Sequence, residues 1–380
     1  MKVLLLLFLL SAALAWTSVN VLNFGAIGDN VTDCSAAFYA ALAAVEAAGG
    51  GEVVVPAPGL FKTLPLNLTS NTRLTVNGQI WAIETTNTSR WPVVGVVKTY
   101  VSSFPATRFQ PFIFAPGPDR TTNISIAGSG EINGAGPFWW CKPDGQGGCP
   151  NFDERRPHLA SFHNVSGLEI SGVTLRNSAF WTLRPVFCED VHIHDATITT
   201  PWCGGDSPGG PGGAWPPLPA RRCPRFSPRP TPSPHFFLLG PNTDGIDVDS
   251  SVNVLIERCD ISVGDDHVTV LAGAGASGLL WALPSRNVTV RDNVLGTGMG
   301  LSVGSSVSGG VSDVLFTRNV MRERAQDWGL GAHISEWGAQ ARATAPAAAA
   351  TRCRSHPSLP SRRDSCQLRR LHPQCRVHRQ

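Results

Sequence analysis

The chain has 380 residues and a formal net charge of +3, but its charge is unevenly distributed. Residues 351–380 contain eight arginines and one aspartate, and residues 201–240 contain four arginines and one aspartate, so the remaining sequence is net negative. Positive charge confined to two segments argues against nucleic-acid binding. Beyond the first residues no run reaches the ~18 apolar residues of a membrane-spanning helix, so we also expect no membrane partner.

Residues 1–15 predict a secretory signal peptide. Lys2 precedes an apolar run over residues 3–10, and residues 13–15 read Ala-Leu-Ala, which has the form of a cleavage site. We therefore expect a soluble protein that is secreted to the extracellular space or the cell wall. An exported protein may form disulfides, and Cys141 and Cys149 bracket a short Gly-rich loop that favours a local pair. Six sequons would be candidate glycosylation sites: Asn30, Asn67, Asn87, Asn123, Asn164 and Asn287.

The next segment predicts a short capping helix. Residues 36–48 are rich in alanine, Asp33 or Ser35 could cap the start of the helix, and three glycines at residues 49–51 would end it. Three valines at residues 53–55 then begin a strand. From this point the sequence predicts short strands almost throughout.

These strands share one pattern, which is a turn residue, an alternating strand, a break and a second apolar pair. Examples are NISIAGSGEI from Asn123, GLEISGVTL from Gly167, DVHIHDATI from Asp190, NVLIERCDI from Asn253, NVTVRDNVL from Asn287 and DVLFTRNVM from Asp313. From the second of these onward, successive segments begin 23, 63, 34 and 26 residues apart. A period of about 20–30 residues with Asn and Gly turns predicts an all-β fold, a right-handed parallel β-helix over residues 16–334. An antiparallel β-sandwich is the alternative.

Two segments interrupt or end this pattern. Residues 202–241 are rich in proline and glycine and have no strand periodicity, so they predict an insertion of forty residues into an otherwise regular coil. The insertion could be a surface loop or a translated intron. Residues 335–380 form an Ala-rich and then Arg-rich tail without a strand pattern. Because proline removes a backbone donor, we expect neither segment to join the solenoid.

Three aspartates recur at the spacing of one coil. The sequence from 242 to 270 is NTDGIDVDSSVNVLIERCDISVGDDHVTV, in which Asp265 and Asp266 follow Asp244 by 21 and 22 residues. Successive coils of a parallel β-helix stack about 4.8 Å apart, so these residues should lie on adjacent coils and on the same side. Repulsion among them raises the pKa of at least one, which gives a proton donor beside ionised bases. Glycoside hydrolysis uses such a pair of carboxyl groups.

Other interpretations of these motifs are open at this stage. Asn, Asp and Gly favour turns for their own reasons, so each motif alone could be a coil corner. The same carboxylates, with Asp247 and Asp249 close by, could instead bind calcium. His267 could tune the aspartate pair or point outward from its strand.

The motifs together resemble those of the polygalacturonases, which are glycoside hydrolase family 28 of the pectin-lyase-like β-helix superfamily. NTDGIDVDSS and GDDHVTV resemble the Asn-Thr-Asp and Gly-Asp-Asp motifs of that family. NFGAIGDNVTDCSAAFYAAL and GGGEVVVPAPGLFKT are similar to its N-terminal cap, and GLSVGSSVSGGVSDVLF is similar to a later coil. The resemblance covers roughly residues 19–200 and 242–334.

The resemblance implies a function and roles for these residues. The reaction would be the inverting hydrolysis of α-1,4 links between galacturonic acid units, with pectic polysaccharide as the partner and a monomeric enzyme. Asp265 would be the general acid, and Asp244 and Asp266 would activate the attacking water. An inverting enzyme holds its acid and base about 6.5–9.5 Å apart to admit that water. No metal or cofactor is implied.

Three substrate-binding candidates follow from the same resemblance, namely Asn242, Met299 and His333. Two of them depart from the family pattern. Met299 stands at the histidine of the Gly-His-Gly motif, and methionine cannot transfer a proton. His333-Ile334-Ser335 stands at the Arg-Ile-Lys motif, so Ser335 lacks the charge that would hold a substrate carboxylate. The coil that carries a tyrosine in the family has no counterpart here.

These departures leave alternatives to a polygalacturonase. A non-catalytic or impaired β-helix protein that binds pectin or cell wall would explain Met299 and Ser335. A pectate lyase would need calcium. Arg184 could face the groove and attract a polyanion, while Trp139 and Trp140 could stack on a sugar ring or pack beside the Cys141–Cys149 loop.

Overall fold

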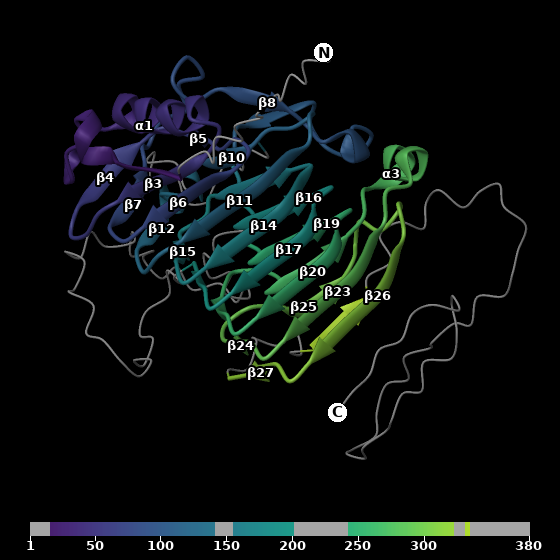
Figure 1. Cartoon of the computed structure of the whole chain (residues 1–380). Helices are drawn as coiled ribbons and strands as arrows, with labels where there is room; N and C mark the ends of the chain where they lie inside the picture. Colours follow the sequence, from purple (N-terminus) through teal and green to yellow (C-terminus); the bar gives the residue numbers. More distant parts are fainter. Residues whose placement is uncertain (1–15, 141–154, 201–241, 323–330, 335–380) are drawn as a thin grey trace, which may run out of the picture.

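The structure is a computed structural model that describes residues 16–140, 155–200, 242–322 and 331–334. Three long parallel sheets run along one axis (Figure 1). Sheet A contains, in spatial order, β1 (Thr17–Asn20), β3 (Gly51–Val55), β6 (Thr72–Val76), β11 (Thr121–Ala127), β14 (Val165–Ser171), β17 (Glu189–His194), β20 (Val252–Glu257), β23 (Ser285–Arg291) and β26 (Val311–Thr317).

The other two sheets follow the same order along the axis. Sheet B contains β2 (Asp29–Asp33), β4 (Leu60–Thr63), β7 (Gln79–Ala82), β12 (Glu131–Asn133), β15 (Thr174–Arg176), β18 (Thr197–Thr199), β21 (Asp260–Ser262), β24 (Val294–Leu295) and β27 (Val320–Met321). Sheet C contains β5 (Leu66–Asn67), β10 (Ile113–Ala115), β13 (Ala160–His163), β16 (Leu183–Val186), β19 (Ile246–Asp249), β22 (Val268–Leu271), β25 (Gly300–Val303) and β28 (Gly331–Ile334). Each return of the chain to a sheet adds one parallel strand, so the predicted parallel β-helix is confirmed and the β-sandwich is wrong.

The core consists of rows of apolar side chains that stack from coil to coil. In sheet A, Ile170 pairs with Ile193, Ile193 with Ile256, and Ile256 with Val290. All four side chains are fully buried. The alternation that the sequence shows in each strand therefore places every second residue in one continuous row inside the solenoid.

The turn residue before each sheet A strand has a structural role. Asn71, Asn123, Gly167, Asp190, Asn253, Asn287 and Asp313 all have positive φ angles, between 54° and 77°. Asn and Gly tolerate this left-handed conformation, which other residues avoid. The side chains also stack: the amide of Asn253 donates to Asp190 Oδ1 at 3.0 Å, and the amide of Asn287 donates to Asn253 Oδ1 at 2.9 Å. This ladder explains why the same residue types recur at one point of each coil.

A helix covers the first coil, as predicted. Helix α1 (Ser35–Ala47) begins where Asp33 Oδ1 accepts the backbone N–H of Ser35 at 2.9 Å. Its buried residues include Phe38 and Val45, which pack on the core cluster. Gly49 follows with a φ of 79°, where the chain turns into β3. The 3-10 helix η1 (Val21–Phe24) lies beside α1 in the same cap.

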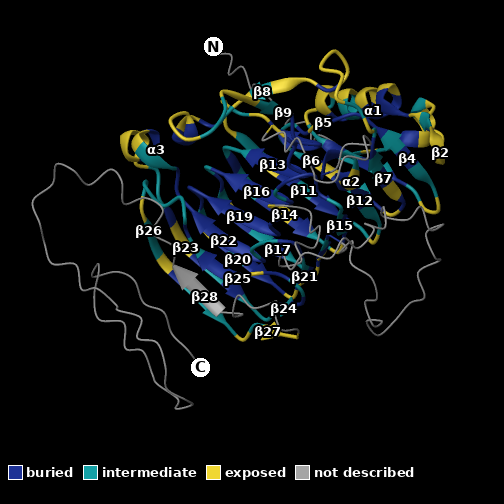
Figure 2. Cartoon of the chain, turned by 180° about the vertical axis from the view of Figure 1, so that it is seen from behind, coloured by how far each residue is buried: buried dark blue, intermediate teal, exposed yellow. Residues whose placement is uncertain are grey.

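Sheet C is covered on its outer face as well as its inner face. Strands β16, β19 and β22 are buried along their whole length, as the dark blue strands of Figure 2 show. A small apolar cluster joins Val186 of β16 to Val97 and Tyr100 in and beside the 3-10 helix η2 (Lys98–Tyr100). Helix α3 (Gly275–Trp281) packs against η2, and the hairpin of β8 (Val93–Gly95) and β9 (Thr107–Phe109) flanks it. Outward-facing polar side chains of these strands, such as Arg184 and Asp249, are therefore largely buried.

Several expectations fall on residues outside the described part of the chain. These are the signal peptide at 1–15, the Cys141–Cys149 pair, the insertion at 202–241 and the tail at 335–380. The strands on either side of the insertion belong to adjacent coils, since Val191 pairs with Val254. Among the described residues, no helix is long and apolar enough to span a bilayer.

The ladder generates a stability prediction. We expect Asn253→Ala to lower the free energy of unfolding by about 2–3 kcal/mol, because it adds left-handed backbone strain of about 1–2 kcal/mol to the loss of hydrogen bonds. Asn253→Gly removes the same hydrogen bonds without that strain and should cost about half as much. Denaturant unfolding of both variants measures the difference. Equal losses for alanine and glycine would show that backbone conformation at this position does not matter.

Candidate active site

The candidate site lies on the outer face of sheet C, where the chain enters β19 and β22. The two strands pair in register, Ile246 with Val268 and Asp249 with Leu271. Just before them, the N–H of Gly245 donates to the carbonyl of Asp266 at 2.8 Å. The register therefore places Asp244 beside Asp266 on the adjacent coil.

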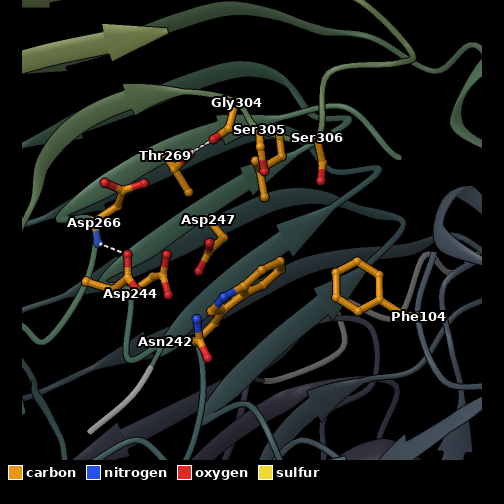
Figure 3. Close-up of a pocket in the computed structure, with 12 residues that line it drawn as sticks. Phe104, Asn242, Asp244, Asp247, Asp266, Thr269, Gly304, Ser305 and Ser306 are labelled. Atoms are coloured by element: carbon orange, nitrogen blue, oxygen red, sulfur yellow. Dashed lines mark hydrogen bonds between the residues drawn. The ribbon is translucent and has the colours of Figure 1, made fainter. Parts of the chain in front are cut away.

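The three aspartates converge in one cleft. One carboxylate oxygen of each of Asp244, Asp265 and Asp266 lies within 4.8 Å of one oxygen of each of the others. The cleft has a volume of about 230 Å³ (Figure 3). Its lining consists of Phe104, Trp181, Asn242, Asp244, Asp247, Asp265, Asp266, Thr269, Leu271, Gly304, Ser305 and Ser306.

The nearest oxygens of these residues lie closer together than the two carboxyl groups of an inverting glycosidase, which are about 6.5–9.5 Å apart. The separation between whole carboxyl groups stays a prediction for this chain. The register sets the three residues side by side and turns their side chains toward one cleft.

Burial and mutual repulsion set the protonation of the cluster. Burial, followed by the charge of Asp266, raises the pKa of Asp265 to about 6 against the opposing effect of the Asp266 N–H. That N–H donates to Asp265 Oδ1 at 2.9 Å. Asp244 is 6% exposed, and burial, followed by the charges of Asp265, Asp247 and Asp266, raises its pKa well above the usual value. The cluster therefore holds protons that isolated aspartates would lose.

A fourth carboxyl group, Asp247, enters the same cleft from β19. It is fully buried, and neither of its oxygens has a hydrogen-bond partner among the described residues. Burial raises the pKa of Asp247 well above its usual value, while the charge of Arg184 opposes this. The sequence suggests Asp247 only as a calcium ligand, because nothing local shows that this position faces the site.

Arg184 lies on β16 next to the cleft but is already engaged. Its guanidinium donates to Asp249 Oδ2, and it sits over the rings of Tyr100 at 5.0 Å and Trp181 at 4.9 Å. The residue is 6% exposed and is not among those that line the cleft. Arg184 therefore neutralises Asp249 rather than presenting a free cation.

His267 neither tunes the aspartates directly nor points outward, so both expectations for it are wrong. It is fully buried, its Nδ1 accepts the N–H of Gly300 at 3.0 Å, and its Nε2 lies 3.1 Å from the carbonyl of Gly296. Nε2 therefore carries the proton, and burial lowers the pKa of the ring. This neutral imidazole supports the turn at residues 296–300.

Ser302 is a site residue that sequence analysis missed. Its hydroxyl donates to Asp266 Oδ2 at 2.6 Å from β25, one coil beyond Asp266. The alternation of β25 could have shown that Ser302 faces away from the core, but not that it meets Asp266. Asn242 does line the cleft, and its Oδ1 accepts a hydrogen bond from Arg156 at 3.2 Å.

Trp139 and Trp140, for which sugar stacking and packing were the two alternatives, belong to the core. Trp139 is 7% exposed and packs against Trp91, with ring centroids 5.4 Å apart, and Phe109, at 5.0 Å. Trp140 donates its indole N–H to the carbonyl of Ala179. Of the two alternatives, packing is correct, and Trp181 is the tryptophan that reaches the cleft.

Comparison with known proteins identifies the family. Residues 52–327 match the profile of the glycosyl hydrolases family 28, which is more than half of the chain. The chain belongs to glycoside hydrolase family 28. The match includes all four aspartates of the cleft.

Relatives of this family 28 chain are named as polygalacturonases or exopolygalacturonases. A "Probable polygalacturonase" of Vitis vinifera is 28% identical over 304 residues, 78% of this chain and 53% of the relative. An exopolygalacturonase of Zea mays is 26% identical over 76% of this chain and 54% of the relative. The crystal structure of an exopolygalacturonase from Thermotoga maritima aligns with a TM-score of 0.62 and 27% identity over 84% of this chain and 70% of that one. The chain spans about half the length of the curated relatives it matches.

The two remaining substrate-binding candidates of this family 28 chain are Met299 and His333. Met299 is 37% exposed and does not line the cleft, although its N–H donates to the carbonyl of Asp265 at 2.8 Å. His333 pairs through its backbone with Ser302 in sheet C, and its side chain is outside the described part of the structure. Met299 therefore contributes through its backbone, which holds the turn against Asp265.

The turn beside His267 generates the next prediction. A Cβ added at Gly298 would lie 2.4 Å from His267 Cε1, and the φ of Gly298 is 155°. We expect Gly298→Ala to lower the free energy of unfolding by about 1–3 kcal/mol through overpacking. Gly95→Ala is the matched control, since a Cβ there meets nothing within 4 Å. Denaturant unfolding of the two variants checks this, and equal stability of both would contradict the packed turn.

Proposed function

We propose that this family 28 chain is a secreted hydrolase of the polygalacturonase type, which cleaves α-1,4-galacturonosyl links of pectin with inversion. One observation carries the proposal: Asp244, Asp265 and Asp266, supplied by two motifs one coil apart, converge in one cleft. The names of the relatives support pectin as the substrate class. Secretion rests on the signal-like sequence of residues 1–15.

Asp265 acts as the general acid. Such a group must carry a proton when the substrate binds, and the pKa of about 6 keeps Asp265 protonated in mildly acidic solution. Asp265 gives this proton to the glycosidic oxygen while the bond between that oxygen and the anomeric carbon breaks. The leaving sugar departs as a neutral alcohol.

Asp244 and Asp266 activate the water that replaces the leaving sugar. One of these carboxylates takes a proton from water, and the hydroxide oxygen bonds to the anomeric carbon. Ser302 fixes Asp266 by its hydrogen bond to Oδ2. The charge of the cluster also favours the positive charge that develops on the sugar ring in the transition state.

Inversion rests on the family resemblance and not on the carboxylate separation. The nearest oxygens lie closer than the about 6.5–9.5 Å of most inverting enzymes. In the proposed mechanism the attacking water lies between Asp244 and Asp266, and Asp265 reaches the glycosidic oxygen.

A second function is favoured by one observation. By the resemblance Met299 stands at the position of the family histidine, and its exposed side chain is not among those that line the cleft. A chain without that histidine could bind pectin and not cleave it. The experiment below separates binding alone from turnover.

We expect purified protein to release reducing ends from polygalacturonate, and Asp265→Asn to lower kcat by at least about 100-fold, the usual contribution of a general acid. Because Asp265 must be protonated, kcat/KM should fall as the pH rises through about 6. Reducing-end assays across pH measure both effects. Asp313→Asn, an exposed ladder residue at which Asn also tolerates the positive φ, is the control and should behave as the wild type.

Two outcomes would contradict the proposal. Turnover that survives Asp265→Asn would remove the general acid from the mechanism. Binding of polygalacturonate by the wild type without release of reducing ends would favour the non-catalytic function. The Asp313→Asn control shows that neither result comes from a general loss of folding.

A further inference from the structure

Asp247 extends the three aspartates to a cluster of four carboxyl groups. It points into the cleft that Asp244, Asp265 and Asp266 line (Figure 3). Both of its oxygens and Oδ1 of Asp244 are buried and have no hydrogen-bond partner among the residues that the structure describes. Buried polar groups normally have partners, so this arrangement indicates a ligand that supplies them.

The surrounding residues do not satisfy Asp247. Arg184 lies on the neighbouring strand β16, but its guanidinium donates to Asp249 Oδ2 instead. The hydroxyl of Thr269, which follows on β22, donates to the carbonyl of Gly304 at 2.8 Å. Asp247 therefore directs both of its carboxylate oxygens at the cleft.

The spacing of the carboxylates fits a calcium-sized cation. Calcium takes six to eight oxygen ligands at about 2.3–2.6 Å, so two ligands of one ion lie at most about 4.6–5.2 Å apart. The oxygens of Asp244, Asp265 and Asp266 lie within 4.8 Å of one another and meet this limit. Magnesium demands near-ideal octahedral geometry at about 2.0–2.1 Å, whereas calcium accepts the more flexible arrangement of carboxylates from two coils.

We propose that Asp244, Asp265 and Asp266 bind one hard divalent cation of the calcium class, which Asp247 faces from the same cleft. Carboxylates from two adjacent coils supply oxygen ligands, and water completes the coordination. The bound cation engages the carboxyl groups that would act as acid and base, and it therefore blocks hydrolysis. This last consequence rests on the proposed function, whereas cation binding itself does not.

Terbium luminescence tests the site in the absence of polysaccharide. Tb³⁺ occupies calcium sites and emits when a nearby tryptophan is excited, and Trp181 lines this cleft. We expect sensitised emission from the wild type that Ca²⁺ displaces. Asp247→Asn should weaken Tb³⁺ binding at least 10-fold, and Asp313→Asn should leave it unchanged.

Two further variants locate the ion and guard against misfolding. Trp181→Phe should remove most of the sensitised emission and preserve Ca²⁺ affinity in calorimetry. Asp244→Asn should weaken Tb³⁺ binding as Asp247→Asn does, and it keeps the test available if Asp247→Asn does not fold. Thermal unfolding of each variant reports folding independently of binding.

The proposal is overturned if Asp247→Asn and Asp313→Asn bind Tb³⁺ equally, or if Ca²⁺ does not displace Tb³⁺. It is also overturned if emission persists in Trp181→Phe, since the ion would then lie elsewhere. If the wild type binds Ca²⁺ at this site but does not hydrolyse polygalacturonate, the cation site stands. Only the proposed hydrolase function is then refuted.

Discussion

In-register parallel pairing between adjacent coils is the constraint on which both the core and the site depend. Backbone hydrogen bonds hold each strand beside the one a coil earlier, so residues one period apart become neighbours. In sheet A this stacks Ile193 on Ile170 in the core. In sheet C the same pairing, Ile246 with Val268, sets Asp244 beside Asp266. The same in-register pairing thus stacks apolar side chains inside the solenoid, which is favourable. On the outer face it brings carboxylates together, which is unfavourable.

The energetic balance between these contacts explains why the site can exist. The rise in the pKa of Asp265 from 3.8 to about 6 means that its ionisation costs about 3 kcal/mol more than in water. Burying one large aliphatic side chain contributes about 1.5–3 kcal/mol, and the rows of sheet A repeat this in coil after coil. The stacked core therefore offsets the cost of the acidic cluster. The paired strands β19 and β22 keep the turns that carry these aspartates side by side.

The sequence predicts the parts of this molecule that repeat. Turn residues such as Asn253 and Asn287 mark the coils because only a few residue types accept their positive φ. The period then places Asp244, Asp265 and Asp266 together without any knowledge of the cleft. The period does not predict how far apart their carboxyl groups lie, because it gives the coil on which a side chain lies and not the direction in which it turns.

The remaining site residues depend on contacts between coils and cover segments, which leave no local pattern. Ser302 meets Asp266 from the next coil, and Trp181 reaches the cleft while Trp139 packs inside. Asp247 is buried because α3 and η2 help to cover the outer face of sheet C, which the alternation of β19 cannot reveal. His267 was misjudged for the same reason, since its partners, Gly296 and Gly300, lie in a turn on the following coil.

The most direct test of the account is an NMR titration of the aspartate carboxyl carbons, with Asp265 assigned by substitution. Coupling across coils predicts that Asp265 titrates near pH 6 and that Asp266→Asn lowers this midpoint, because the neighbouring negative charge is removed. A midpoint near 4 that is insensitive to Asp266→Asn would contradict the claim that register between coils brings these carboxyl groups into one interacting cluster.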